Sequence, residues 1–226
     1  MKKILLFFVF AVSVLGQAKD PYKIIDALKE KLNAVDNYSA DVSINIDVNF
    51  LQMPDSKAKV YFKKPDKFRI VSDGFAMLPK QGLNFSPAKF FNEDFDAIYL
   101  RQDTLLNKDV DIIKVIPRSD TSEIILSTIW IDYKNNVLLK VEANTKETGT
   151  FGMEFVYKNA LRYGLPDEVH FSFNIKGVRI PNMNPQNVED KKEMMRGKTV
   201  EGVVTIKYSD YVINKGIDDK VFEEKN

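Results

Sequence analysis

The stretch ADVSINIDVNF, residues 40–50, alternates apolar and polar side chains without a break. Because successive side chains of a β-strand point to opposite faces, this pattern predicts a strand with one dry face and one wet face. Strands of this kind are typical of antiparallel sheets, which pack one face on the core and expose the other to water. The stretch therefore predicts a sheet, and the surrounding sequence indicates how large that sheet is.

Similar strand patterns follow along most of the chain. They centre on Val60 and Phe68 and then cover 97–106, 109–117, 123–133, 137–146, 150–158, 167–176 and 199–213. Short turns separate them, with Asn135–Asn136 and Gly164 as the clearest turn residues. Successive hairpins of about nine to eleven strands make an antiparallel meander, so we expect a mainly β fold with few helices, in the α+β class.

One segment upstream of residue 40 has the spacing of a long helix. Asp20 and Pro21 supply a cap and a first-turn proline, and apolar residues then recur every three or four positions as far as Val35. The helix should end near Asp36–Asn37. A helix is only about 10 Å wide with its side chains, so this one is too narrow to cover the apolar face of the whole sheet.

A sheet with this much apolar surface can hide it by curling on itself. About eight strands form a barrel that its own side chains fill, whereas more strands leave room inside. We therefore expect an apolar cavity that holds an apolar ligand. For any single inward residue the alternative is ordinary core packing. The predicted ligand-binding residues on the strands are Val42, Ile44, Ile46, Val48, Val60, Phe62, Phe68, Ile70, Met153, Phe155, Phe171 and Phe173.

Two stretches interrupt the strand pattern, 74–96 and 177–198. The first is rich in phenylalanine and the second contains a methionine pair, and loops of this length inside a compact domain are usually functional or disordered. We expect both to act as lid segments over the cavity. Methionine adapts to chains of different shape, and the alternative is that the pair fills gaps in a loop. These stretches add Phe75, Phe90, Phe91, Met194 and Met195 to the predicted ligand-binding residues.

The first 18 residues have the features of a signal peptide. A basic pair, Lys2–Lys3, precedes an apolar run over 4–15, and Gly16 and Ala18 offer cleavage sites. The competing interpretation is a membrane span, which needs roughly 18–20 apolar residues and is therefore longer than this run. We expect an exported, soluble, periplasmic protein with a single domain over 19–226.

Composition argues against several other classes of function. The chain has 33 basic and 32 acidic residues, so no basic excess attracts nucleic acid, and it has no cysteine for a disulfide, a thiolate metal site or a lipid anchor. The one histidine, His170, falls on the wet side of its strand pattern, and Asp132 is interpreted as a turn cap. We expect no enzyme activity, no metal and no cofactor. The alternative to this expectation is a pair of carboxylates from separate strands that act in glycoside hydrolysis.

Four segments resemble the outer-membrane lipoprotein carriers, the LolA-like proteins. YFKKPDKFR, residues 61–69, resembles their K-R-P-x-x-F segment, and IWIDYKNNVLLKV, residues 129–141, is similar to their central W-I-D hairpin. Leu165–Pro166 before a strand and GIDDKVF, residues 216–222, also match the family pattern. These segments occur in the family's order and span nearly the whole chain after the signal peptide.

The resemblance implies an incomplete antiparallel β-barrel closed by a helical lid, which carries lipoproteins through the periplasm. Its implied partners are lipoprotein acyl chains or other lipid, an inner-membrane donor and an outer-membrane acceptor, and we expect a monomer. In the family an arginine before the proline helps to hold the lid closed. Here Lys64 takes that position and is the lid-locking candidate, although lysine lacks the planar five-donor group of arginine.

An alternative function comes from the same resemblance. The fold is also similar to that of lipid-binding lipoproteins and of an envelope-stress sensor domain, so the fold alone does not fix the cargo. The alternative is an envelope lipid or lipoprotein sensor or binding module without transfer activity.

Overall fold

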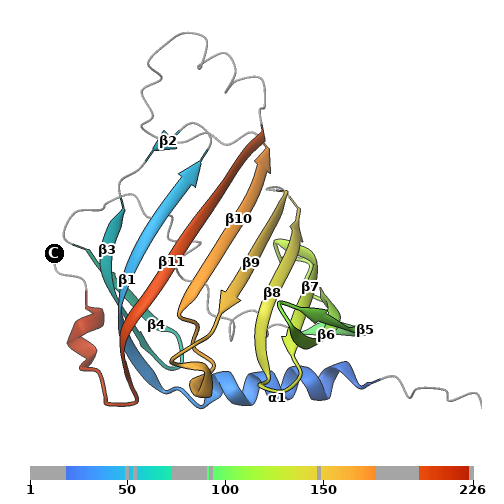
Figure 1. Cartoon of the computed structure of the whole chain (residues 1–226), viewed down its shortest axis with the longest axis horizontal. Helices are drawn as coiled ribbons and strands as arrows, with labels where there is room; N and C mark the ends of the chain where they lie inside the picture. Colours follow the sequence, from blue (N-terminus) through green and yellow to red (C-terminus); the bar gives the residue numbers. More distant parts are fainter. Residues whose placement is uncertain are drawn as a thin grey trace, which may run out of the picture.

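One long antiparallel sheet and one helix dominate the computed structural model, which describes residues 19–48, 51–52, 55–72, 91, 94–146, 149–176 and 199–223 (Figure 1). The helix is α1 (Pro21–Asn33), and two short 3-10 turns, η1 (Leu161–Tyr163) and η2 (Asp219–Phe222), occur late in the chain. The strands are β1 (Asn37–Val48), β2 (Leu51–Gln52), β3 (Ser56–Lys63), β4 (Lys67–Val71), β5 (Phe95–Leu105), β6 (Lys108–Pro117), β7 (Ile124–Asp132), β8 (Val137–Thr145), β9 (Thr150–Val156), β10 (Glu168–Lys176) and β11 (Thr199–Ile213).

The sheet has the order β4-β3-β1-β11-β10-β9-β8-β7-β6-β5, with the short β2 paired to β1. Strands β5 to β11 form the predicted meander, and each begins and ends within two residues of its predicted range. The meander prediction does not contain the pairing of β1 with β11, which joins the two ends of the described chain through pairs such as Ile44 with Ile206. This pairing places all the described strands in a single sheet.

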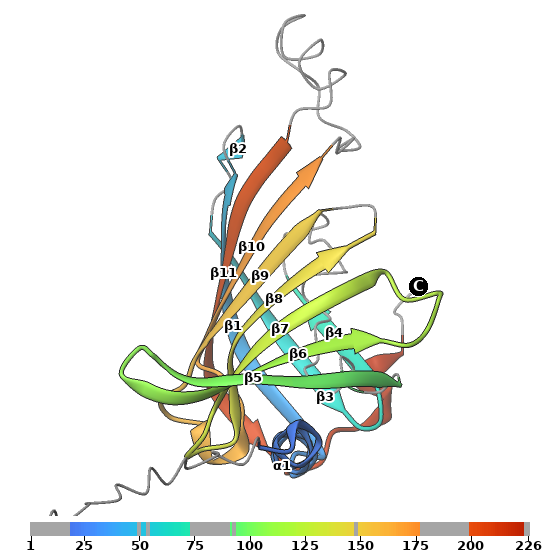
Figure 2. The same cartoon turned by 90° about the vertical axis from the view of Figure 1, so that its right-hand side faces the viewer.

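The sheet curves strongly but does not close. Strands β4 and β5 are the two ends of the sheet order, and Figure 2 shows the strands wrapping around an interior with α1 at one end of it. The prediction of an incomplete antiparallel barrel with an N-terminal helix is confirmed. Among the described residues, no helix is both long enough and apolar enough to cross a membrane.

Helix α1 begins as predicted and ends earlier than predicted. The Asp20 carboxylate accepts a hydrogen bond from the Tyr22 N–H at 3.0 Å, which satisfies one of the free donors of the first turn. The helix ends at Asn33 and not near Asp36–Asn37. The reason lies in a distant residue, because the Asn214 side chain accepts from the Asp36 N–H at 2.8 Å and donates to the Ala34 carbonyl at 3.1 Å, so the backbone turns toward β1.

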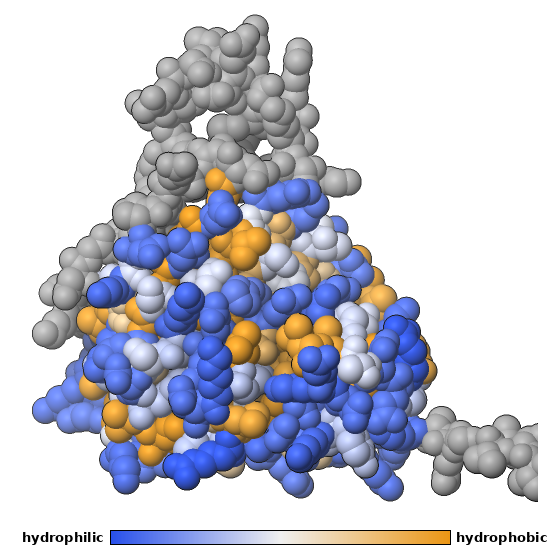
Figure 3. Space-filling view, viewed as in Figure 1, coloured by the Kyte–Doolittle hydropathy of each residue, from blue (hydrophilic) through white to orange (hydrophobic). Residues whose placement is uncertain are grey.

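The two faces of the sheet differ in chemistry. The concave face carries two apolar clusters, which meet at Tyr208. A third, smaller cluster lies on the opposite face, where Val110 and Ile112 of β6 pack with Leu161 of η1. Most of the convex face over β8 to β11 is hydrophilic, as Figure 3 shows. The two larger apolar clusters therefore lie on the concave face.

Candidate functional site

The concave face brings together most of the predicted ligand-binding residues. Val42, Ile44 and Val60 are buried in one apolar cluster, with Ile46, Phe68 and Ile70 packed against it. Phe91, Met153 and Phe155 are buried in the other cluster, and Phe171 packs against it. Strand register puts Val48 and Phe173 on the same face, both opposite Gly202, and the Phe62 ring lies 5.4 Å from the Tyr38 ring. Phe75, Phe90, Met194 and Met195 lie outside the described residues, as do residues 1–18, the whole of 177–198 and most of 74–96.

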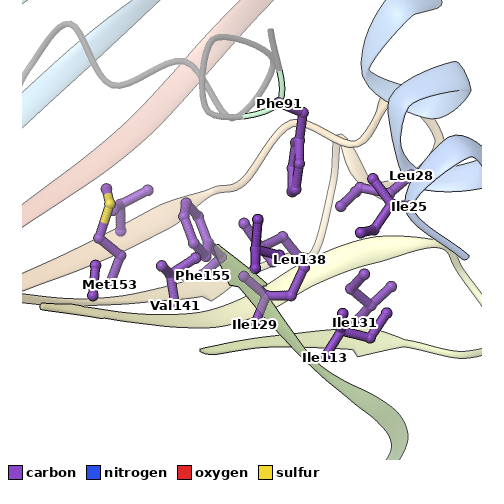
Figure 4. Close-up of a cluster of buried hydrophobic side chains, with 13 residues drawn as sticks. Ile25, Leu28, Phe91, Ile113, Ile129, Ile131, Leu138, Val141, Met153 and Phe155 are labelled. Atoms are coloured by element: carbon purple, nitrogen blue, oxygen red, sulfur yellow. The ribbon is translucent and has the colours of Figure 1, made fainter. Parts of the chain in front are cut away.

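Helix α1 fills only one end of this face. Ile25 and Leu28 are buried against Ile131 and Leu138, and Phe91 lies over the same cluster (Figure 4). Among the strands, the helix has its main contacts with β5 and β8. On β9, β10, β11 and β1 the concave-face residues Phe155, Val169, Ile206 and Ile44 are buried as well, so the less covered part of the face begins one row further along these strands.

Burial changes along this next row across the sheet. The row consists of Ile129, Val141, Met153, Phe171, Val204 and Ile46, each opposite the next on neighbouring strands. The first three side chains are fully buried, whereas the last three are only partly buried. The apolar lining thus continues beyond the region that the helix covers.

Aromatic rings line the less covered half. The rings of Phe151 and Phe171 are 5.8 Å apart, and those of Phe171 and Phe173 are 5.9 Å apart. Gly202 leaves room for the Phe173 ring, because a Cβ atom at residue 202 would lie 2.5 Å from the end of that ring. Since rings expose large flat apolar surfaces, this half of the face suits a flexible hydrocarbon chain.

Sequence reasoning missed several residues of this face. Phe151 has the same strand parity as the predicted Met153 and Phe155, so the period-two pattern itself could have found it. Ile113, Ile129 and their neighbours on β6 to β8 were also left out. Their strands carry apolar side chains on both faces, and alternation then gives no preference for one face.

Two polar side chains are buried on the otherwise apolar face. Asp111 is 1% exposed, and its Oδ1 accepts from Lys19 Nζ at 2.8 Å and from the Tyr99 hydroxyl at 3.1 Å. Burial and the hydrogen bond to Asp111 raise the pKa of Tyr99 to about 12. Ser127 is 0% exposed, and in the part of the chain that the structure describes neither its Oγ nor the Asp111 Oδ2 atom has a hydrogen-bond partner. A buried polar atom without a partner costs about 1–3 kcal/mol.

Lys64, the lid-locking candidate, contacts the end of α1. Its ammonium donates to the carbonyl of Asn33 and lies 3.1 Å from the Asp36 carboxylate. Its backbone N–H donates to the Asp36 carbonyl at 2.9 Å. A cation at this position complements the negative end of the helix dipole. The residue thus ties the β3–β4 hairpin to the helix.

The polar residues singled out in the sequence have structural partners. Asp132 accepts from the backbone N–H groups of Lys134 and Asn135, both at 2.9 Å, so the turn-cap interpretation is confirmed. His170 lies 3.2 Å from the Thr205 hydroxyl and 3.3 Å from Glu168. Within the described residues, no three His, Cys, Asp or Glu side chains come together as a metal site would require.

A groove of about 620 Å³ crosses the convex face, outside the candidate site. Its lining consists mainly of outward-facing polar residues of β8 to β11, including Lys140, Glu142, Glu154 and Glu201. Lys140 pairs with Glu142 at 2.8 Å, so part of this charge is already neutralised. The polar lining does not suit an acyl chain, and the concave face remains the candidate site.

Comparisons with known proteins agree with this architecture. No family model matches the sequence, and no curated protein is similar to it in sequence. Among solved structures, a LolA superfamily protein from Nitrosomonas europaea is 13% identical, with a TM-score of 0.60 over 92% of this chain and 99% of the other. A putative outer membrane lipoprotein-sorting protein domain from Vibrio parahaemolyticus is 11% identical, with a TM-score of 0.62 over 91% of this chain and 97% of the other.

A third solved structure extends the comparison. A DUF1329 family protein from Desulfovibrio piger is 12% identical, with a TM-score of 0.58 over 91% of this chain and 98% of the other. All three similarities cover nearly the full length of both chains, and at these identities they speak for the fold. The chain has the LolA-like fold.

Proposed function

We propose that this protein is a periplasmic carrier that holds the acyl chains of lipoproteins or other lipids against the concave face of its open sheet. The proposed role is binding and transfer, not catalysis. The observation that supports it is the row in which Phe171, Val204 and Ile46 continue the apolar lining beyond the cover of α1. A soluble protein gains by covering such a surface, and an acyl chain has the matching chemistry.

The size of the binding energy also bears on transfer. Burying about 15 methylene groups at about 0.8 kcal/mol each gives on the order of 12 kcal/mol before the costs of binding. A carrier that kept all of this energy would release its cargo too slowly. A conformational change that exposes the concave face offsets part of it, and the attachment of α1 through Lys64 is our candidate for the element that moves.

The similarity to the Vibrio parahaemolyticus protein supports the class of cargo. That protein is a putative outer membrane lipoprotein-sorting domain, and it shares the fold over nearly its whole length. By this analogy we propose exported lipoproteins as the first cargo to test, with donor and acceptor proteins in the two membranes.

Dye titration tests the binding site directly. Purified protein is titrated with the hydrophobic dye anilinonaphthalene sulfonate, and the dye is then displaced with palmitate and with a triacylated lipopeptide. Adjacent valines on β11 provide a matched pair, because Val204 lies on the concave face and Val203 is 40% exposed on the other. We expect Val204→Asp to abolish saturable binding and Val203→Asp to preserve it, with folding checked by circular dichroism and the milder Val204→Thr as a second variant.

The outcomes separate the candidate functions. A wild-type protein without any saturable, displaceable dye site contradicts the proposal. Saturable binding together with movement of a fluorescent lipopeptide between phosphatidylethanolamine vesicles supports a carrier. Binding without any such transfer favours the sensor or binding module instead.

A further inference from the structure

Four small side chains form one row across the concave face. Ala97, Val115, Ser127 and Ala143 lie opposite one another in turn on β5, β6, β7 and β8. Larger side chains flank the row on the same strands, with Phe95 and Ile124 on one side and Tyr99, Ile113, Ile129 and Val141 on the other. Val115, Ser127 and Ala143 are 0–1% exposed, so the row is closed in this structure, and a ligand reaches it when the concave face opens as proposed above.

Ser127 occupies the middle of this row and is the one polar side chain in it. Its hydroxyl is fully buried and has no hydrogen-bond partner among the described residues. Its cross-strand neighbours, Val115 and Ala143, belong to the buried cluster of the concave face, so the hydroxyl lies on that face too. Alanine would fill this position without burying an unsatisfied polar atom, whereas the serine hydroxyl leaves a donor that a group from outside the chain can satisfy.

The row connects with the less covered half of the face. Beyond Ala143 the next residue across the sheet is Phe151, followed by Phe173, and both rings are only partly buried. At the other end, the Ala97 N–H donates to the Tyr22 hydroxyl of α1 at 3.2 Å. A chain lying along the row thus has an apolar path on one side of Ser127 and the helix on the other.

We propose that Ser127 donates a hydrogen bond to the carbonyl oxygen of an acyl ester or amide seated on this row, while the hydrocarbon tail lies along Phe151, Phe171 and Phe173. This inference rests on the proposed lipid-binding function and specifies its ligand. The site selects acylated molecules over hydrocarbons or alkyl ethers of the same length. A carbonyl is a strong acceptor that those molecules lack.

A pair of matched lipids and a pair of matched variants test the assignment. Dye displacement is measured for 1-palmitoylglycerol and for 1-hexadecylglycerol, which differ in an ester carbonyl but share the head group and a chain of the same length. We expect the wild type to prefer the ester by about fivefold, as one neutral hydrogen bond allows. Ser127→Ala should remove this preference, whereas Thr128→Val, which deletes a neighbouring hydroxyl that faces the convex groove, should keep it.

The outcomes distinguish this inference from the proposed function. Ser127→Ala removes an unsatisfied group, so it should fold at least as stably as the wild type, and its melting temperature provides that check. If both lipids bind equally to the wild type, or if Ser127→Ala retains the ester preference, the role of Ser127 is wrong and lipid binding stands. If neither lipid displaces the dye, the proposed function itself fails.

Discussion

The half-buried ion pair between Lys19 and Asp111 gives the sharpest prediction about stability. Lys19 precedes α1, whereas Asp111 lies on β6, so their contact at 2.8 Å ties the start of the helix to the sheet. The lysine ammonium also lies 4.1 Å from the centre of the Tyr133 ring. We expect Lys19→Met to destabilise the fold, because it leaves the carboxylate buried without its cation.

The magnitude follows from the burial of the two partners. Removing one partner of a fully buried pair costs about 3–5 kcal/mol. The Lys19 side chain is 33% exposed, so water already screens its charge and weakens the pair, which lowers the cost. Loss of the contact with the Tyr133 ring adds about 0.5–1 kcal/mol. We therefore expect a loss of about 2–4 kcal/mol, which corresponds to roughly 5–12 °C in melting temperature for a chain of this size.

Urea and thermal unfolding of a double-mutant cycle measure this loss. Asp111→Leu in the Lys19→Met background replaces the pair with apolar side chains and should recover most of the stability. Lys59 serves as the control, since it pairs with Asp41 at 3.1 Å and both side chains are about half exposed. Lys59→Met should change the free energy of unfolding by less than about 1 kcal/mol. The reasoning is refuted if Lys19→Met costs no more than Lys59→Met, or if its full cost persists beside Asp111→Leu.

Two further predictions concern the helix attachment and the pH dependence of stability. Lys64→Met removes the donor to the Asn33 carbonyl, so we expect the α1 amides to exchange about fivefold faster in hydrogen-exchange mass spectrometry. Lys64→Arg should retain the protection. Unchanged exchange in Lys64→Met would contradict the role of Lys64 in attaching the helix. Burial raises the pKa of Tyr208 to about 12, whereas the unfolded chain loses this proton near pH 10. Between these two pH values the folded state binds more protons than the unfolded state. The free energy of unfolding therefore falls as the pH rises from 10 to 12. Tyr208→Phe should make this fall shallower in urea titrations and the exposed Tyr133→Phe should not; equal slopes in both variants would count against it.

Local patterns in the sequence determined most of the elements of this fold. The Asp20–Pro21 signal located the start of α1, and the alternation in residues 40–50 located β1 and the side of it that is dry. The cap at Asp132 was also recognisable, because it acts within its own turn. These features depend on contacts between near neighbours in the chain, which the sequence displays directly.

The membership of the candidate site was predicted only in part. Alternation identified Val42, Ile44 and Met153 because their strands carry polar residues on the other side. It could not assign Asp111 to the dry face, since Val110 and Ile112 are buried on the opposite face of the same strand. A period of two separates the two faces of a strand and does not say which one is concave.

Only the tertiary structure determined the contacts between residues that are far apart in the chain. Such residues meet where β1 pairs with β11, where Asn214 binds the segment that follows α1, and where Lys64 contacts Asn33. The unpartnered hydroxyl of Ser127 is of the same kind, because its burial depends on strands on both sides of β7. The free energy of these contacts comes from the simultaneous packing of many segments. Local sequence therefore specifies the strands, whereas their order, and hence the concave face, forms only when the whole sheet assembles.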